Sequence, residues 1–483
     1  MNKSISALEP TLIWKHFAKI CEIPHISKKE QQIINYVSSL GHSLRLETII
    51  DDTGNVLIRK PASTGKEKNP GVILQSHLDM VPQKNVDKKF NFDTDAIEAY
   101  IDGEWVKASG TTLGADNGIG VAAMLAILES TNITHGPMEA LFTIDEETGM
   151  TGVFNLKLDL LKGQYLLNLD TEEEGELCVG CAGGINTSGK MLIKYEPTEK
   201  NVAAYEIKTN GLKGGHSGAD IHLGRANANK ILNRFLLLIP ETCNLRLHSF
   251  NGGSLRNAIP REAVAIINIS KGSEQIFMHT LNMFNETIKN EYAQSDPDVH
   301  ITANLCDVPD KVISIHDQEK IEHIIHSLPN GPLRMLADMP DVVETSTNLA
   351  IVQTTDKDIS FLSLSRSAVE HEKNNIASMI ESIYKLAGAE VQHDGSYPGW
   401  KPDLSSPLLQ NMKKIYASLY HKEPRIKVVH AGLECGIIGS AYPALQMVSL
   451  GPTILHPHSP SEKVYIPSVE KFWKYLLEVL KTL

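Results

Sequence analysis

Short apolar runs alternate with helical segments over the first 185 residues, and this alternation limits the possible folds more than any other feature. Buried strands are predicted at 71–76, 140–144 and 165–169. Helices are predicted at 11–21, 28–40 and 117–130, the last nearly all apolar and therefore buried. Strands that alternate with helices predict an α/β domain with a mostly parallel central sheet flanked by helices.

The pattern changes after Gly183-Gly184. Residues 190–295 predict a strand, a helix at 224–239, two strands and a helix at 274–292. A similar order follows over 298–388: a strand, a helix at 316–327, strands near 333–338 and 360–366, and a helix at 371–387. The repeated order predicts one α+β unit used twice, as in a doubled ferredoxin-like domain.

The α/β pattern returns from about residue 400. A helix is predicted at 404–419, strands at 426–429 and 445–450, and a final helix at 468–481. We therefore expect one domain built from both chain ends, 1–187 and 396–483, with 188–395 inserted as a second domain.

Composition excludes several classes of protein. With 483 residues, 42% hydrophobic and 22% charged, the chain is typical of a soluble globular protein of about three domain-sized units. A net charge of −12 disfavours nucleic-acid binding. No apolar run approaches about 18 residues and no secretory signal is visible, so we expect no membrane partner and a cytoplasmic location. Six cysteines do not make a disulfide scaffold, and the lone Cys178-x-x-Cys181 pair is more typical of buried packing than of a zinc or redox site.

Polar clusters follow the apolar runs. They are Ser76-His77-Leu78-Asp79, residues 114–118, 145–149 and 168–172, with a fifth candidate at His456-Pro-His458. In open α/β sheets ligands bind beyond the carboxyl ends of strands, so these side chains can converge. Histidine with several carboxylates suits zinc, and also manganese or cobalt. Two ions that share one carboxylate are a recurrent hydrolytic arrangement, and they would offset the cost of burying so many carboxylates.

The adjacent pair Glu146-Glu147 suggests a division of labour. Neighbouring residues in an extended backbone point to different sides. One glutamate could therefore bind a metal while the other faces the substrate and acts as general base.

Each residue taken alone also has a simpler explanation. Asp116 could cap a helix, His77 could be a core histidine, and Asp79 or Asp170 could belong to turns. Glu146 and Glu147 could form a solvated face, and His458 could be a loop histidine. The combination of all of them at strand ends favours a metal centre.

The sequence resembles the zinc aminopeptidase, carboxypeptidase and aminoacylase superfamily with a two-metal site, and within it most closely the bacterial aminoacyl-histidine dipeptidases, or cytosol non-specific dipeptidases. The resemblance spans nearly the whole chain. It rests on SHLDMV (76–81), TTLGADNGIGVA (111–122), DEETGMTG (145–152), LNLDTEEEGE (167–176), GCAGG (180–184), KGGHSG (213–218), GGSLRNAIPRE (252–262), SRS (365–367), HAGLECG (430–436) and GPTILHPHSPSE (451–462).

This resemblance implies two divalent ions per subunit, with zinc expected and manganese or cobalt compatible. The implied ligands are His77, Asp116 and Asp170 for one ion, and Asp116, Glu147 and His458 for the other. Glu146 would be the general base, and Asp79 would orient the His77 ring. Spacing alone does not choose between His456 and His458, and the family's His-Ser-Pro pattern selects His458.

The resemblance also makes 188–395 a lid or dimerisation domain on a catalytic domain formed by both chain ends. In it, His216 would stabilise the oxyanion, and Asn257 and Arg366 would bind the substrate's backbone and C-terminal carboxylate. Without the resemblance, His216 could be a helix-start histidine and Arg366 a surface ion pair. The insertion is about twice the usual size, so whether His216 acts within its own chain or across a homodimer interface stays open.

The implied function is metal-dependent hydrolysis of unblocked dipeptides, including Xaa-His dipeptides. Two alternatives remain: an N-acyl amino-acid or tripeptide hydrolase of the same superfamily, and a catalytically inactive peptide-binding relative. The residues themselves determine neither the native metal nor a side-chain preference.

Overall fold

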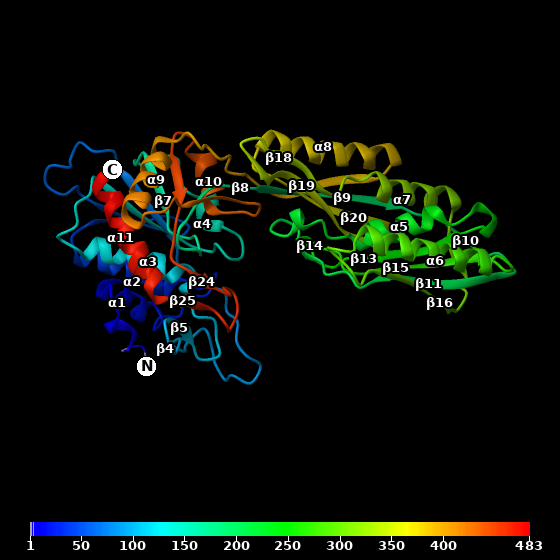
Figure 1. Ribbon diagram of the computed structural model, residues 1–483, viewed down its shortest axis with the longest axis horizontal. Helices are drawn as coiled ribbons and strands as arrows, with labels where there is room; N and C mark the ends of the chain where they lie inside the picture. The colour runs from blue at the N-terminus through cyan, green and yellow to red at the C-terminus, as the bar shows by residue number, and fades with distance from the viewer. Residues whose placement is uncertain (1, 3) are drawn as a thin grey trace. The chain divides into compact units, whose positions relative to one another are not determined.

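A computed structural model describes residue 2 and residues 4–483, which form two compact units (Figure 1). Unit 1 comprises the described residues up to Gly180, Trp400–Val428 and Leu433–Leu483, and unit 2 comprises Cys181–Gly399 and Val429–Gly432. The expected boundaries at 187/188 and 395/396 fall inside the paired strands β9 (Gly183–Leu192) and β21 (Glu390–Tyr397). The units divide ahead of the first strand and behind the second, because these two strands belong to one sheet.

Within the described residues, unit 1 holds an eight-stranded sheet with the order β1-β2-β6-β3-β7-β23-β8-β22. The four central strands, β6, β3, β7 and β23, pair in parallel, whereas β1, β2 and β8 pair antiparallel to their neighbours. The strands are β1 (Glu47–Ile50), β2 (Val56–Lys60), β3 (Val72–His77), β6 (Met138–Thr143), β7 (Tyr165–Asn168), β8 (Glu176–Cys181), β22 (Arg425–Val429) and β23 (Gln446–Ser449). The predicted α/β fold class is thus confirmed, although the sheet is mixed and its parallel pairs lie among the four central strands.

Helices flank this sheet, and α3 is the most deeply buried. They are α1 (Thr11–Ile20), α2 (Gln31–Ser43), α3 (Ala115–Glu129), α4 (Thr151–Phe154), α9 (Pro407–Tyr420), α10 (Glu434–Ala441) and α11 (Ile466–Thr482). Helix α3 packs against β3 and α1, and every residue from Ala115 to Leu128 is buried, which explains its apolar sequence. A small sheet joins β24 (Ile454–Leu455), β25 (Lys463–Tyr465), β5 (Trp105–Ala108) and β4 (Ala99–Asp102).

Unit 2 is built on one antiparallel sheet whose order, among the described residues, is β16-β11-β15-β13-β19-β20-β9-β21, with β18 paired to β19. Besides β9 and β21, its strands are β11 (Val202–Asn210), β13 (Arg246–Gly252), β15 (Ala263–Ser270), β16 (His300–Cys306), β18 (Gly331–Leu336), β19 (Met339–Thr354) and β20 (Asp358–Ser367). Its helices are α5 (Ala228–Leu238), α6 (Glu274–Glu291), α7 (Ile315–Ser327) and α8 (Glu370–Ala387). Two short ribbons pair β10 (Tyr195–Pro197) with β17 (Lys311–Ile313) and β12 (Gly215–His216) with β14 (Ala258–Ile259).

The sheet of unit 2 divides into two β-α-β-β-α-β halves, the ferredoxin-like order. The inner half is β11-α5-β13-β15-α6-β16, and the outer half is β9-α7-β19-β20-α8-β21. They meet where β13 pairs with β19. The strand expected near 298 as the start of a second unit is instead β16, the last strand of the inner half. The outer half takes its first strand from β9, so the inner half is inserted between β9 and α7.

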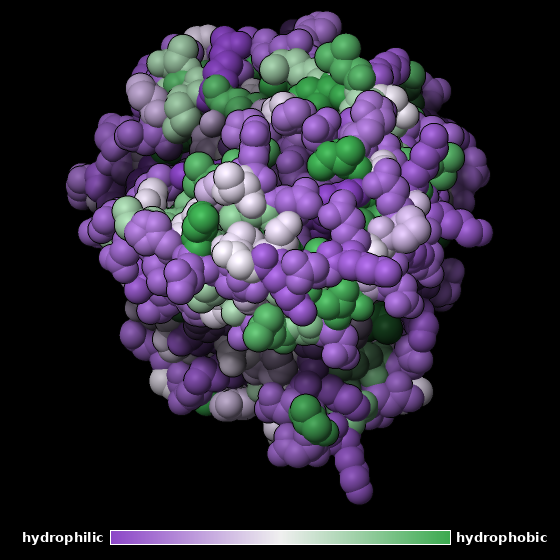
Figure 2. All heavy atoms as spheres, turned by 90° about the vertical axis from the view of Figure 1, so that its right-hand side faces the viewer, coloured by the Kyte–Doolittle hydropathy of each residue, from purple (hydrophilic) through white to green (hydrophobic). Residues whose placement is uncertain are grey.

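Aromatic and aliphatic side chains from the sheet and helices of unit 2 form a continuous core, in which Phe235 and Phe277 are fully buried. Figure 2 views the end of unit 2 that carries the β10 label in Figure 1, where hydrophilic side chains predominate and hydrophobic ones stand singly or in small groups. Among the described residues, every helix is too short or too polar to cross a bilayer.

Candidate metal centre

His77 is the last residue of β3 and one of the most enclosed residues of the centre, with 2% of its surface exposed. Its Nε2 lies 3.3 Å from Asp116 Oδ1 and 3.4 Å from Asp170 Oδ1. Its Nδ1 lies 3.0 Å from the main-chain oxygen of Asp79 and 3.4 Å from the Asp79 carboxylate. Asp79 was expected to orient this ring, and both its carbonyl group and its carboxylate lie near Nδ1, the carbonyl group being the nearer.

Asp116 lies in the first turn of α3, where its backbone is not helical. The residue before the helix is Gly114, and no side chain caps the helix from that position. Asp116 directs its carboxylate at two imidazoles instead, with Oδ2 3.2 Å from His458 Nε2. Asp116 therefore does not act as the N-cap of this helix. The neighbouring Asn117 donates from Nδ2 to the Asp170 carboxylate and to the Leu169 carbonyl group.

Glu146 and Glu147 lie in a turn after β6, which corrects the extended backbone expected for this pair. The turn begins at Asp145, whose φ of 55° is left-handed. The carboxylate of Asp79 holds the turn in place, because it accepts from the Glu146 N–H at 3.0 Å and the Glu147 N–H at 3.2 Å. It also accepts from the Ser27 hydroxyl at 2.7 Å.

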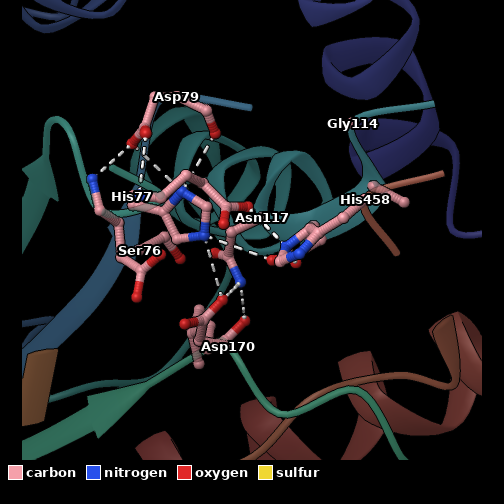
Figure 3. Close-up of polar contacts among 12 residues, drawn as sticks. Ser76, His77, Asp79, Gly114, Asn117, Asp170 and His458 are labelled. Atoms are coloured by element: carbon pink, nitrogen blue, oxygen red, sulfur yellow. Dashed lines mark hydrogen bonds and ion pairs between the residues drawn. The ribbon is translucent and has the colours of Figure 1, made fainter. Parts of the chain in front are cut away.

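His458 comes from a loop near the C-terminus, and it joins residues far away in the sequence (Figure 3). Its Nε2 lies 2.9 Å from Glu147 Oε1 as well as 3.2 Å from Asp116. His456, the alternative that spacing left open, is absent from the candidate ligand groups found among the described residues.

The described residues contain three groups whose potential ligand atoms all lie within 4.8 Å of one another: His77, Asp116 and Asp170; His77, Glu146 and Glu147; and Asp116, Glu147 and His458. The first and third share Asp116. They contain the same five residues that the family resemblance implies as metal ligands.

Burial and neighbouring charges shift the pKa values in the cluster. Burial lowers the pKa of His77, but the carboxylates of Asp170 and Asp116 outweigh it and hold that pKa well above 6.5. Burial raises the pKa of Glu146 well above its ordinary value, and Asp170 and Glu434 add to the rise. Burial also raises the pKa of Asp170 to about 6. These shifts reflect crowded, buried negative charge, which a bound cation would relieve.

Glu434 is a further buried carboxylate, with 1% of its surface exposed. Its Oε2 accepts from Gln75 Nε2 at 2.5 Å and from the Thr143 hydroxyl at 2.8 Å, while Oε1 has no hydrogen-bond partner among the described residues. Burial raises the pKa of Glu434 to about 8. Because Gln75 and Thr143 are near the ends of β3 and β6, Glu434 connects the two strands just ahead of the candidate ligands.

The three residues expected to bind substrate lie in unit 2, where the fold groups them. His216 Nδ1 accepts from the N–H groups of Gly218 and Ala219, at 3.1 and 2.9 Å. A Cβ at Gly218 would be only 3.1 Å from both Arg366 Nε and His216 Cε1, so the two side chains are close. Asn257 has an exposed side chain, and its carbonyl group accepts from Ser217 N, next to His216.

Arg366 is 4% exposed, and its environment differs from the surface ion pair that was the alternative. Its Nη1 donates to the Tyr397 hydroxyl at 2.7 Å, and its Nε has no hydrogen-bond partner among the described residues. Burial lowers the pKa of His216, and the positive charge of Arg366 lowers it further.

Sequence reasoning missed Glu462, which is 2% exposed and accepts four backbone hydrogen bonds from residues 113–116. No signal for it was visible in the sequence, because the helix predicted at 117–130 already had Asp116, a usual capping residue, immediately before it. Glu172 was also missed: burial, with the nearby Asp116 and Asp170 carboxylates, raises its pKa to about 8.

Comparison with known proteins identifies the family. The model of peptidase family M20/M25/M40 matches residues 73–482. The cytosol non-specific dipeptidase of Escherichia coli K12 is 44% identical over 99% of this chain and 98% of its own. The aminoacylhistidine dipeptidase structure from Vibrio alginolyticus is also 44% identical, covers 99% of this chain and 98% of that chain, and superposes with a TM-score of 0.95. An aminopeptidase structure from Bacillus cereus, 15% identical with a TM-score of 0.58 over 98% of each chain, shares the fold. The chain therefore belongs to peptidase family M20/M25/M40, as its motifs predicted.

Proposed function

We propose that this protein is a metal-dependent dipeptidase that hydrolyses unblocked dipeptides, including Xaa-His dipeptides. One observation carries the proposal: two groups of candidate ligands, His77–Asp116–Asp170 and Asp116–Glu147–His458, share the Asp116 carboxylate. A shared carboxylate is the arrangement used by paired hydrolytic metal ions.

The residues fit two divalent cations, and zinc is the expected metal. Two imidazoles and three carboxylates are ligands that zinc accepts, and manganese or cobalt could also bind. Glu147 Oε1 is buried and lies 2.9 Å from His458 Nε2, yet it makes no hydrogen bond among the described residues, which suits a cation better than a proton donor. When bound, the cations would acidify a water molecule and polarise the peptide carbonyl group.

Glu146 is the general base of this proposal. Its carboxylate takes a proton from the attacking water and returns it to the departing amine. The Asp79 carboxylate fixes the Glu146 backbone through its N–H group, so the base is held without using its own side chain.

Substrate contacts are assigned to unit 2. Arg366 binds the C-terminal carboxylate of the dipeptide, supported by its burial and by the unpartnered Nε, since a guanidinium group binds carboxylate with two parallel hydrogen bonds. His216 accepts two N–H groups at Nδ1, so in its neutral form the ring presents an Nε2–H donor that can stabilise the oxyanion. Asn257 contacts the substrate backbone.

The choice of dipeptides rests on two relatives that are each 44% identical over nearly their full lengths, one named a cytosol non-specific dipeptidase and the other an aminoacylhistidine dipeptidase. The name of the first relative also supports a cytoplasmic location for this protein. A homodimer is proposed as the assembly state, and light scattering would distinguish it from the 53.2 kDa monomer.

The proposal is tested by amino-acid release from Xaa-His and other dipeptides, with N-acetylated dipeptides and tripeptides in the same panel. Each is assayed before chelation, after chelation, and after zinc or manganese is restored. Chelator-sensitive cleavage of unblocked dipeptides alone is the expected result. Cleavage of blocked substrates or tripeptides would favour the related acyl or tripeptide hydrolases. Dipeptide binding without products, in folded and metal-loaded protein, would indicate an inactive relative.

A further inference from the structure

The start of α3 is capped by a residue almost 350 positions away. Glu462 Oε2 accepts from Leu113 N at 2.7 Å and Gly114 N at 3.0 Å. Its Oε1 accepts from Ala115 N at 2.8 Å and Asp116 N at 3.2 Å. Because Gly114 provides no side-chain cap, this one buried carboxylate satisfies four consecutive backbone N–H groups in the segment that leads into the helical part of α3.

The same glutamate lies four residues after His458, and the segment between them is a compact turn. The Glu462 N–H donates to the Ser459 carbonyl group at 3.0 Å. The Ser459 hydroxyl donates to the His456 carbonyl group at 2.8 Å and accepts from Ser461 N at 3.2 Å. Fixing Glu462 therefore restrains the backbone that carries His458.

We infer that Glu462 is a positioning residue for the metal centre: it fixes the backbone of Asp116 and the His458 loop relative to each other. Asp116 and His458 are 342 positions apart, and their side chains meet at 3.2 Å. Among the described residues, the hydrogen bonds between these two segments come from the His458 ring and from the Glu462 carboxylate, and only Glu462 accepts from backbone N–H groups. The inference rests on the proposed function, because it concerns the same metal ligands.

A purely structural role would be shared by other buried glutamates, and Glu139 supplies the matched control. It is 6% exposed, lies on β6 in unit 1, and accepts from the N–H groups of Lys162 and Gly163 at 2.7 and 2.8 Å. These amides precede β7, at the opposite end of the sheet from the candidate ligands. Glu139→Gln thus weakens a carboxylate–backbone contact, together with an ion pair to Arg59 at 2.9 Å, without touching the candidate metal ligands.

The experiment compares full-length wild type with Glu462→Gln, Glu462→Asp and Glu139→Gln. The amide of Glu462→Gln turns two of its donors toward backbone N–H groups, whereas Glu462→Asp keeps the charge but is one methylene shorter. Zinc affinity is measured by competition with a chromophoric chelator, and the visible absorption of bound Co²⁺ reports the ligand geometry. Circular dichroism checks folding.

We expect Glu462→Gln to weaken binding of at least one ion by about 10–100-fold and to change the Co²⁺ spectrum. Glu462→Asp should fall between it and wild type, and it serves as the test if Glu462→Gln does not fold. Glu139→Gln should bind both ions as wild type does, even if its melting temperature falls. Wild-type affinity and spectrum in both Glu462 variants, or equal metal loss in Glu139→Gln, would overturn the inference alone. A wild-type protein that binds no divalent ion would overturn the proposed function as well.

Discussion

The carboxylate of Asp79 accepts the backbone N–H groups of two consecutive residues that were expected to do different work, Glu146 and Glu147. Both side chains can approach His77 because they project from a turn, in which neighbouring residues need not point to opposite faces. Their division of labour therefore depends on turn geometry and on Asp79. On the proposed assignment, a single residue change should separate metal binding from proton transfer at this site.

Replacing Glu146 by Gln should leave metal content unchanged and lower kcat by about 10²–10⁴-fold, because the amide cannot accept the proton from water. Metal content and steady-state kinetics measure the two effects separately. Glu173→Gln is the control, since Glu173 is an exposed partner of Arg425. Near-normal kcat in Glu146→Gln would show that another group is the base.

Replacing Asp116 by Asn should remove metal, because the shared ligand of both groups loses its charge while its size is kept. Elemental analysis after dialysis should find less than one ion per chain, with activity lost in parallel. Full occupancy by two ions would contradict the bridging role of Asp116.

At the scale of elements, the two halves of unit 2 are joined by side chains as well as by the pairing of β13 with β19. Asn227 is the N-cap of α5 in the inner half, and it accepts from the N–H groups of Asn229 and Lys230. Its amide donates to the Asn348 side chain and the Leu349 carbonyl group on β19, at 3.2 and 3.0 Å. One buried side chain thus serves a helix end and the junction between the halves.

Asn227→Ala should lower the free energy of unfolding by about 2 kcal/mol, because it removes the cap and leaves the buried Asn348 side-chain oxygen on β19 without its donor. Urea denaturation followed by far-ultraviolet circular dichroism measures this loss. Ser314→Ala, which removes the cap of α7 alone, should cost about 1 kcal/mol. Equal losses in both variants would mean that the contacts with β19 add nothing.

The sequence predicted elements well where hydrophobic periodicity was clear and poorly where polar residues are buried. The apolar pattern at 117–130 predicted α3 to within two residues at its start. The long strand β19 was not predicted, because Thr345 and Thr347 are buried yet polar. Their hydroxyl groups pair across strands with Ser367 and Ser365, at 2.9 and 3.0 Å. Such pairing satisfies the buried hydroxyl groups, but it leaves no alternation of apolar residues in the sequence from which the strand could be predicted.

The candidate ligands were found from motifs, whereas their supports were not. His77 and Asp170 each follow an apolar run, so the local sequence alone predicts that they lie at the ends of strands. The role of Glu462 depends on N–H groups at 113–116, so it exists only after folding brings the two segments together. Hydrophobic periodicity could not predict the turn at Asp145 either, because this turn depends on the left-handed backbone of a single residue.

The stability of the whole molecule should depend on pH through buried neutral histidines, and His430 in unit 2 is the clearest case. Burial lowers its pKa from 6.5 to about 3, and the positive charge of Arg366 adds to the effect. Its Nε2 lies 2.7 Å from the Ser346 hydroxyl. Because the folded pKa is below the unfolded value, acid protonates the unfolded chain first, and stability falls as pH drops from about 6.5 toward 3.

Between pH 7 and pH 5, His430 alone should cost about 2 kcal/mol of stability. His430→Gln removes this titration, so its stability should fall less over the same range. Urea denaturation of both proteins at the two pH values gives the difference directly, because all other titrating groups are common to both. Parallel losses in the two proteins would show that His430 does not stay neutral in the fold.

The inner half is inserted between β9 and α7 of the outer half, and unit 2 as a whole is inserted into unit 1. The chain therefore contains one insertion nested within another. During synthesis the inner half of unit 2 is the first to have all of its strands. The outer half follows when β21 is made, and unit 1 is completed last. Among the candidate metal ligands, His77 is made before unit 2 and His458 only after it. A ribosome that stalls between Gly432 and His458 would therefore leave unit 2 fully synthesised and the set of candidate metal ligands incomplete.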